Sequence, residues 1–325
     1  MKNKLFFVSL ATLAVTLTGC GTTKQTGEGV VTSTPQAEVS QEKEESETVK
    51  VTHAQGKTEV PRNPKNVVVF DYGTLDALDT LGVEVKGVVP GNLPEYLKHY
   101  DSEAYVNVGE LFEPNLEKIY ELEPELIIIG GRQADFYDQL TEIAPTISMS
   151  LDNDNYVESF KTNMTYLGKI FDKEEEVKER LGAIDTAISE VSTLAKEKSA
   201  KGLIVLANDT AISVYGPSSR FGIIHQDFGV EPVDTTIDTS NHGQKATFEY
   251  IVEENPDYLF VVDRAAIAGG ENTAQVLFEN ELMKDVSAYK NNRIAYLNPR
   301  AWYVASGGFT STEIMINEVK ELLNR

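Results

Sequence analysis

The chain has 325 residues, a single cysteine and a formal net charge of −22 at pH 7. So acidic a balance argues against nucleic acid as a partner, because phosphate binding requires a basic surface. Small anionic ligands are not excluded, since the Debye length at physiological salt is about 8 Å and a few arginines in a cleft can dominate locally. The single cysteine, Cys20, excludes an intramolecular disulfide and a catalytic cysteine elsewhere.

The amino-terminal segment has the pattern of a secretory signal. Two lysines precede an apolar stretch, residues 5–17, which is too short to span a bilayer comfortably. It ends in Leu-Thr-Gly-Cys at 17–20, which resembles the bacterial lipobox, whose cysteine is lipidated and becomes the mature amino terminus. We therefore expect a signal peptide at residues 1–19 and a lipid anchor on Cys20, which holds a protein on a membrane without spanning it. The alternative is an ordinary signal peptide with an incidental cysteine.

The rest of the chain divides by composition. Residues 20–48 are polar, with almost no large apolar side chain, and are expected to form a disordered tether. The patterned remainder is too long for one small core and suits two lobes, an N-terminal lobe at 49–155 and a C-terminal lobe at 200–325. Between them, residues 156–199 contain few helix breakers, spaced apolar residues and dense Glu and Lys, which predicts one or two long helices. Such a connection should limit closure of the lobes.

Both lobes open in a related way. The N-terminal lobe begins with a short apolar strand at 67–70 and a helix from about Thr74. The C-terminal lobe begins with a strand at 203–206, then a Gly-Pro-Ser-Ser turn that should cap a helix over 220–228.

The C-terminal part ends in a strand, a loop and a helix. We expect the strand at 293–297, the loop at 298–308, and a closing helix from Thr310 to Leu323 that is capped by Thr310 or Ser311.

Two stretches of the chain, 115–132 and 247–264, align without a gap. They read NLEKIYELEPELIIIGGR and TFEYIVEENPDYLFVVDR, and Glu, Ile, Pro and Arg recur at matching positions. Each predicts a helix that a proline stops, then a strand buried on both faces, and then an arginine at the strand's carboxyl end. In open α/β sheets, ligands bind at the carboxyl ends of the strands. Unless the similarity is due to chance, the repeat predicts two related α/β lobes that line a positively charged cleft.

Three arginines are the main candidates for that cleft. Arg132 and Arg264 end the two copies of the repeat, and Arg220 follows the Gly-Pro-Ser-Ser turn of the second lobe. Arginine suits carboxylate and catecholate oxygens, because its planar fork makes two parallel bonds and its charge is permanent. The alternative for each arginine is a surface ion pair.

His242 and Tyr303 are candidate metal ligands. His242 lies in a polar loop, and Tyr303 follows Trp302 just before a Ser-Gly-Gly sequence. Imidazole and phenolate are both reasonable ligands for ferric iron. The alternatives are a solvated histidine and a packing tyrosine. We expect the other three histidines to be structural or exposed.

The sequence gives little support for an enzyme. It has no Gly-x-Ser-x-Gly elbow, no His-Glu-x-x-His, no P-loop and no Gly-x-Gly-x-x-Gly after a strand. Glu117 and Glu249 occupy matching positions near the starts of the repeated helices, where the helix dipole favours a carboxylate and exposure is usual. A sharper hypothesis is that this matched pair docks onto basic residues of a two-fold partner.

Taken together, these features resemble the substrate-binding lipoproteins of iron–siderophore ABC importers. The resemblance covers the chain after the tether and rests on the lipobox, the repeated Glu…Pro-Asp/Glu-aliphatic blocks, the interlobe helix and the late Asn-Asn-Arg-Ile-Ala-Tyr-Leu strand. It implies an α/β fold with two Rossmann-like lobes joined by a long helix, the class III periplasmic-binding-protein fold. The arginines with His242 and Tyr303 are similar to the catecholate-binding, petrobactin-type branch.

The resemblance also implies roles for these residues. The ligand would be a ferric siderophore, no intrinsic cofactor is expected, and the protein would act at the extracytoplasmic face of the cell membrane. His242 and Tyr303 could complete the iron coordination when the siderophore leaves two sites open. Glu117 and Glu249 would contact a two-fold permease that works with its ATPase. The expected ligand-binding set is Arg132, Arg220, Arg264, His242, Tyr303 and Trp302.

Two alternatives stay open at this point. A haem or corrinoid carrier on the same scaffold would have aromatics and few arginines in its cleft. A surface-anchored siderophore-processing hydrolase would need a nucleophile with a base. A binder of free metal is disfavoured, because it would need several histidines and carboxylates that converge and the four histidines of the chain are scattered.

Overall fold

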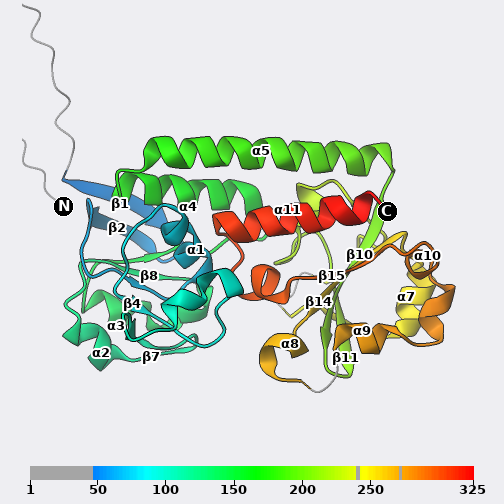
Figure 1. Cartoon of the computed structure of the whole chain (residues 1–325), viewed down its shortest axis with the longest axis horizontal. Helices are drawn as coiled ribbons and strands as arrows, with labels where there is room; N and C mark the ends of the chain where they lie inside the picture. The colour runs from blue at the N-terminus through cyan, green and yellow to red at the C-terminus, as the bar shows by residue number, and fades with distance from the viewer. Residues whose placement is uncertain (1–46, 239–241, 271–272) are drawn as a thin grey trace, which may run out of the picture. The chain divides into compact units, whose positions relative to one another are not determined.

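The computed structural model describes residues 47–238, 242–270 and 273–325, which form two α/β lobes (Figure 1). The expected signal peptide and Cys20, and all but the last two residues of the expected tether, lie outside the described residues. Within the described ranges, no helix is long and apolar enough to cross a membrane.

The N-terminal lobe is built on a five-stranded parallel sheet with the order β5-β4-β3-β8-β9. Its strands are β3 (Val68–Val69), β4 (Gly87–Val88), β5 (Val106–Asn107), β8 (Ile127–Ile129) and β9 (Thr146–Ser148). Strand β8 reads Ile-Ile-Ile and is fully buried, as expected for a central strand that is covered on both faces. Two antiparallel hairpins complete the lobe: β1 (Thr48–His53) with β2 (Gly56–Pro61), and β6 (Gly109–Glu110) with β7 (Glu113–Pro114).

The C-terminal lobe has a mixed six-stranded sheet with the order β13-β11-β10-β14-β15, in which β12 also pairs with β10. Its strands are β10 (Lys201–Asn208), β11 (Ala211–Tyr215), β12 (Glu231–Pro232), β13 (Gln244–Ala246), β14 (Tyr258–Asp263) and β15 (Ile294–Leu297). Strands β10, β14 and β15 run parallel, whereas β11 and β13 are antiparallel to their neighbours.

Helices, most of them short, flank both sheets. The N-terminal lobe carries α1 (Tyr72–Thr80), α2 (Leu116–Glu121), α3 (Tyr137–Thr141) and the 3-10 helices η1 (Glu95–Tyr100) and η2 (Gly131–Phe136). The C-terminal lobe carries α6 (Ile223–Gln226), α7 (Phe248–Glu254), α8 (Ala265–Ala268), α9 (Ala274–Phe278), η3 (Leu282–Asp285), α10 (Ser287–Lys290), the π-helix η4 (Arg300–Val304) and α11 (Phe309–Leu323).

The two copies of the repeat fold alike. The Asn115 side chain caps α2 by accepting from the Lys118 amide at 3.0 Å, and the Thr247 side chain at the matching position caps α7. Each helix is followed by a residue with positive φ, Glu123 at 47° and Asn255 at 44°, which also match in the alignment. Strands β8 and β14 then enter the two sheets. The predicted duplication of a helix–turn–strand unit is thus present in the backbone.

Two helices rather than one join the lobes. Helix α4 spans Tyr156–Ile170 and α5 spans Glu174–Glu197, and α5 runs along both lobes (Figure 1). The break lies at Asp172, which has a φ of 53° and accepts hydrogen bonds from Arg62 and Asn63. The glycines at 168 and 182 lie inside the helices and do not cause the break.

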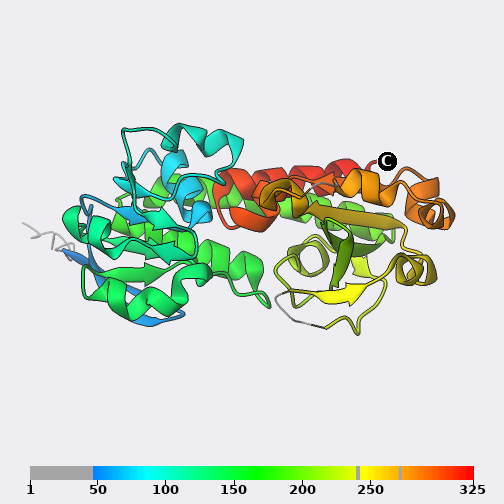
Figure 2. The same cartoon turned by 90° about the horizontal axis from the view of Figure 1, so that it is seen from below.

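Helix α11 makes contacts with both lobes. It runs from the junction of the lobes along the C-terminal lobe, in red in Figures 1 and 2, and packs against both α5 and α1. The buried carboxylate of Asp76, on α1, accepts from the amides of Thr310 at 3.1 Å and Ser311 at 2.8 Å. The predicted N-cap position at Thr310 or Ser311 is wrong, because the N-cap is Gly308. Ser311 still takes part in the cap, since its hydroxyl accepts from the Gly308 amide at 3.0 Å, while the Thr310 and Ser311 amides are satisfied by the other lobe.

The helix predicted over 220–228 is much shorter than expected. Only α6 is α-helical, because the preceding residues form a tight turn in which the Ser219 hydroxyl donates to the Gly216 carbonyl at 2.6 Å. A side chain at Gly222 would begin 1.8 Å from the Pro217 carbonyl oxygen, so the turn closes on a glycine. Ser219 therefore stabilises a turn and does not cap a helix.

Candidate functional site

Three arginines from separate segments converge on Tyr303. Arg132 follows β8 and Arg264 follows β14, so both stand at the carboxyl ends of central strands, as the repeat predicts. Arg220 lies in the turn before α6. Tyr303 lies on the π-helix η4, which follows β15. The structure therefore brings four of the predicted site residues together.

The carbonyl oxygen of Tyr303 accepts hydrogen bonds from two guanidinium groups. Arg132 Nη2 and Arg220 Nη2 both lie 2.8 Å from this oxygen, and Arg132 Nη1 lies 3.5 Å from the carbonyl oxygen of Val304. The last carbonyls of a helix have no partner within the helix, so these are available. Because Arg132 comes from the N-terminal lobe, the shared acceptor ties it to the C-terminal lobe.

The side chain of Tyr303 is held by arginines of the same cluster. The Arg220 guanidinium carbon lies 4.1 Å from the ring centroid and that of Arg264 lies 5.9 Å away, both within cation–π range. Arg264 Nε also donates to the Tyr303 hydroxyl at 3.2 Å, and its Nη1 donates to Asn208 Oδ1 at 2.9 Å. The ring and the hydroxyl of Tyr303 are thus both in contact with cations.

The local field around Arg220 favours an anion. Burial lowers the pKa of Arg220, and the positive charge of Arg132 lowers it further. Its Nε has no hydrogen-bond partner among the described residues although it is buried. An anionic ligand would relieve the repulsion between the guanidiniums and could use their remaining donors.

Two connected cavities meet at this cluster. One, of about 440 Å³, lies between the lobes, and the other, of about 730 Å³, extends over the C-terminal lobe. Phe112, His242 and Tyr303 line both. The charged side chains among the lining residues are Asp71, Arg132 and Arg220 in the first cavity and Lys245, Glu249 and Arg264 in the second. Among the described residues that line the cleft, cations therefore outnumber anions.

Asp71 is the acidic residue that lines the cavity between the lobes. Its carboxylate caps α1 by accepting from the Thr74 amide at 2.8 Å and the Thr74 hydroxyl at 2.9 Å. Burial raises the pKa of Asp71, while these two hydrogen bonds oppose the rise. The Asp71 carboxylate is thus occupied in capping α1.

The structure places His242 and Trp302, both expected to bind ligand, in different surroundings. His242 is exposed and lines both cavities, so its role as an iron ligand stays a prediction. Trp302 is fully buried, and its indole Nε1 donates to Glu318 Oε2 at 2.7 Å. It lines neither cavity, so the expectation that Trp302 contacts ligand is corrected: it packs beneath the segment that carries Tyr303.

Two residues of the cleft were missed by the sequence analysis. Phe112 lies in the β6–β7 hairpin turn with 69% of its surface exposed, which is unusual for a large apolar side chain. Asn208 ends β10 and orients Arg264. The position of Asn208 at a strand's carboxyl end could have marked it, whereas nothing in the sequence distinguishes Phe112.

The matched glutamates do not have the same surroundings. Both are exposed in the first turns of α2 and α7. Glu249 lines the cavity of the C-terminal lobe, and Glu117 lines neither cavity of the cleft.

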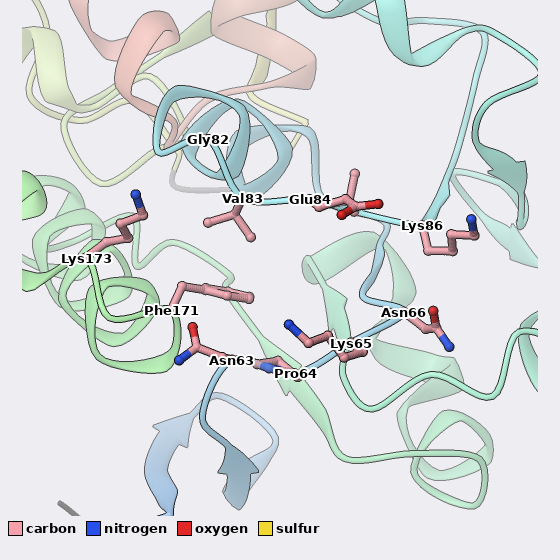
Figure 3. Close-up of a pocket in the computed structure, with 11 residues that line it drawn as sticks. Asn63, Pro64, Lys65, Asn66, Gly82, Val83, Glu84, Lys86, Phe171 and Lys173 are labelled. Carbon is pink, nitrogen blue, oxygen red and sulfur yellow. The ribbon is translucent and has the colours of Figure 1, made fainter.

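A separate pocket of about 300 Å³ lies where the chain enters β3 and β4, at the amino ends of these strands (Figure 3). Lys65, Lys86 and Lys173 come to it from three segments, two of which lead into β3 and β4. Lys65 and Lys86 are exposed, Lys173 pairs with Glu176 at 3.3 Å, and Glu84 offsets part of the charge. This pocket lacks the converging, partly buried donors of the cleft. Across the described ranges, no group of three or more His, Cys, Asp or Glu could hold a metal ion.

Two α/β lobes that are joined by helices and enclose a polar cleft define a ligand-binding protein of the class III periplasmic type. A family model, periplasmic binding protein, matches residues 67–301. The chain belongs to this family, which confirms the fold and the resemblance stated above.

Individual relatives are siderophore-binding proteins. The chain is 43% identical to the petrobactin-binding protein YclQ of Bacillus subtilis, over 100% of this chain and 99% of the relative. The YclQ crystal structure superposes with a TM-score of 0.84 at 45% identity, covering 86% of this chain and 100% of that one. The structure of the catecholate-siderophore binding protein VctP of Vibrio cholerae superposes with a TM-score of 0.82 at 38% identity, covering 85% of this chain and 100% of that one. The ferric-anguibactin-binding protein FatB of Vibrio anguillarum is 32% identical over 94% of this chain and 93% of its own.

Proposed function

We propose that this protein is the substrate-binding component of an ABC importer and captures a ferric catecholate siderophore of the petrobactin type. The observation that carries the proposal is the convergence of Arg132, Arg220 and Arg264 on Tyr303 within the cleft. The likeness to YclQ and VctP supports the same ligand class.

The charge of the ligand fits the cleft. A ferric bis- or tris-catecholate complex carries several negative charges, which three guanidiniums in a partly desolvated site would neutralise. Arginine forks also match paired catecholate oxygens in geometry. A haem or corrinoid carrier is disfavoured, since such ligands call for aromatics and few arginines.

The test is a titration that follows tryptophan fluorescence. Trp302 is the only tryptophan in the chain, and the next residue along the chain is Tyr303. Ferric petrobactin should quench its emission and bind tightly, whereas a ferric hydroxamate should bind weakly. If no catecholate complex binds or quenches, the proposal is wrong.

His242 and Tyr303 would complete the iron coordination in complexes that leave two positions open. Tyr303→Phe should then weaken binding of tetradentate catecholates and spare hexadentate ones. An equal loss for both kinds would mean that the hydroxyl serves only Arg264 or the organic part of the ligand. Delivery requires no chemistry, so incubation should leave the siderophore uncleaved by mass spectrometry; any turnover would contradict a pure binding role.

Delivery would involve the matched glutamates and a membrane anchor. Glu117 and Glu249 would contact a two-fold permease, and Cys20 would carry the lipid that holds the protein at the extracytoplasmic face of the membrane. Replacing both glutamates with Ala should reduce uptake by cells and leave the affinity of the purified protein intact. A fall in affinity for the Glu249→Ala variant alone would mean that its carboxylate, which lines the cavity of the C-terminal lobe, contacts the ligand.

A further inference from the structure

Beneath Tyr303, one carboxylate holds the segment that presents it. Glu318, on α11, accepts from the Asn298 amide through Oε1 at 2.9 Å and from the Trp302 indole through Oε2 at 2.7 Å. These two donors lie before and within the π-helix η4. Each oxygen of the carboxylate therefore fixes a different point of the segment that carries Tyr303.

Asn298 passes this constraint to the start of the π-helix. Its side-chain oxygen accepts from the Arg300 amide at 3.1 Å and the Ala301 amide at 3.2 Å. Its carbonyl accepts from the Trp302 amide at 3.1 Å. The turn closes with a five-residue hydrogen bond from the Ala305 amide to the Arg300 carbonyl at 2.9 Å. Glu318 thus holds the residue that organises the first turn of the π-helix.

The environment makes Glu318 hard to replace. Trp302 is fully buried, so its indole N–H would lose its partner without access to water if the carboxylate were removed. Burial raises the pKa of Glu318, and its two N–H donors oppose the rise by stabilising the charged form.

We infer that Glu318 is a positioning residue for the ligand site: by holding Asn298 and Trp302, it sets where Tyr303 meets the three arginines. Tyr303 must present its carbonyl to Arg132 and Arg220, its ring to Arg220 and its hydroxyl to Arg264 at the same time. A small rotation of the π-helix would disturb all of these contacts together. The inference rests on the proposed function and adds a residue that does not touch the ligand.

The test compares Glu318→Gln with Glu313→Gln. The first keeps the shape of the side chain but puts an NH2 group against one of the two donors. The second alters an exposed glutamate on the same helix and serves as the control. Because Glu318 belongs to the hydrogen-bond network that positions Tyr303, Glu318→Gln should weaken binding of ferric petrobactin by about 10-fold, which is within the range of coupling between residues of one network. Glu313→Gln should bind like the native protein.

Two further readouts separate positioning from general stability. In the Arg220→Ala background, Glu318→Gln should lower the affinity for ferric petrobactin by less than about threefold, because the effects of two residues that act through one another do not add. The unliganded Trp302 emission should shift in Glu318→Gln, while circular dichroism shows a folded protein at the assay temperature. A full additional loss in the Arg220→Ala background, or affinity equal to that of Glu313→Gln, would overturn the inference. Failure of the native protein to bind any ferric catecholate would instead reject the proposed function.

Discussion

The two copies of the repeat share a backbone but use their arginines differently. In the N-terminal lobe, Arg132 donates to main-chain carbonyls of the other lobe. In the C-terminal lobe, Arg264 donates to the side chains of Tyr303 and Asn208. The duplication therefore places each arginine at the carboxyl end of a central strand. The π-helix, with Tyr303, supplies hydrogen-bond acceptors to both arginines.

The difference extends to the other ends of the copies. Asn115 and Thr247 cap matching helices, yet the hydrogen bonds measure 3.0 Å and 3.5 Å. Glu123 and Asn255 share a left-handed backbone, and the Asn255 side chain also accepts from the Ser287 amide at 2.8 Å. Matching positions thus keep their backbone geometry while their side chains take separate roles.

The largest expected effect comes from removing either of the arginines that end the two copies of the repeat. Arg132→Ala and Arg264→Ala should each weaken ferric catecholate binding by about 2–5 kcal/mol, because each leaves ligand charge unpaired in a desolvated site. Arg264→Ala also removes the donor to the Tyr303 hydroxyl. The affinity lost by this variant should therefore be greater for tetradentate than for hexadentate complexes. Isothermal titration with both complexes measures the two losses.

The exposed arginine at the carboxyl terminus supplies the control for these variants. Arg325→Ala removes the same charge outside the cleft and should leave affinity unchanged. Losses below about 1 kcal/mol for both cleft variants would mean that their charges are screened like surface ones.

A smaller effect is expected at the helix caps. Asn115→Ala and Thr247→Ala should each lower the free energy of unfolding by about 1 kcal/mol, since each leaves amides of the first turn without an acceptor. The longer bond of Thr247 predicts the smaller loss. Urea denaturation measures both, and Asn115→Asp with Thr247→Ser should restore most of the stability. A larger loss at Thr247 would reverse the order that the geometry predicts.

The smallest effect should differ in sign between the copies. Glu123→Gly should raise the free energy of unfolding by up to about 1 kcal/mol, because glycine adopts positive φ without the cost that other residues bear. Asn255→Gly should lower it by less than about 1 kcal/mol, because the loss of the hydrogen bond to the Ser287 amide is partly offset by the relief of the positive φ. Equal changes in urea denaturation would mean that the Asn255 side chain adds nothing to its backbone conformation.

Much of the fold could be predicted because periodicity and chain breakers act locally. The repeated units, the paired central strands and the interlobe helices follow from apolar spacing, prolines and composition. The failures arose where a contact that leaves no periodic signal, whether distant or within one turn, decides the local structure. The start of α11 depends on Asp76, and the short α6 depends on the approach of Gly222 to Pro217.

The site was partly predictable for the same reason. Arg132 and Arg264 could be found because the carboxyl ends of parallel strands share an edge. That Tyr303 is the common acceptor could not, since its carbonyl is available only through the π-helix geometry. Trp302 was misassigned because proximity in sequence to Tyr303 says nothing about which way a side chain faces in a π-helix.

The contact between Asp76 and α11 also bears on how the protein can be divided. The first amides of the last helix are satisfied by a carboxylate that lies more than two hundred residues earlier in the chain. A fragment that contained only the C-terminal half would leave the Thr310 and Ser311 amides without this acceptor. A fragment that contained only the N-terminal half would leave Asp76, among the described residues, with only the hydroxyl groups of Thr80 and Tyr96, each at 3.4 Å. During synthesis, the final helix can therefore reach its native state only after α1 is in place, so the two lobes should complete their folding as one unit.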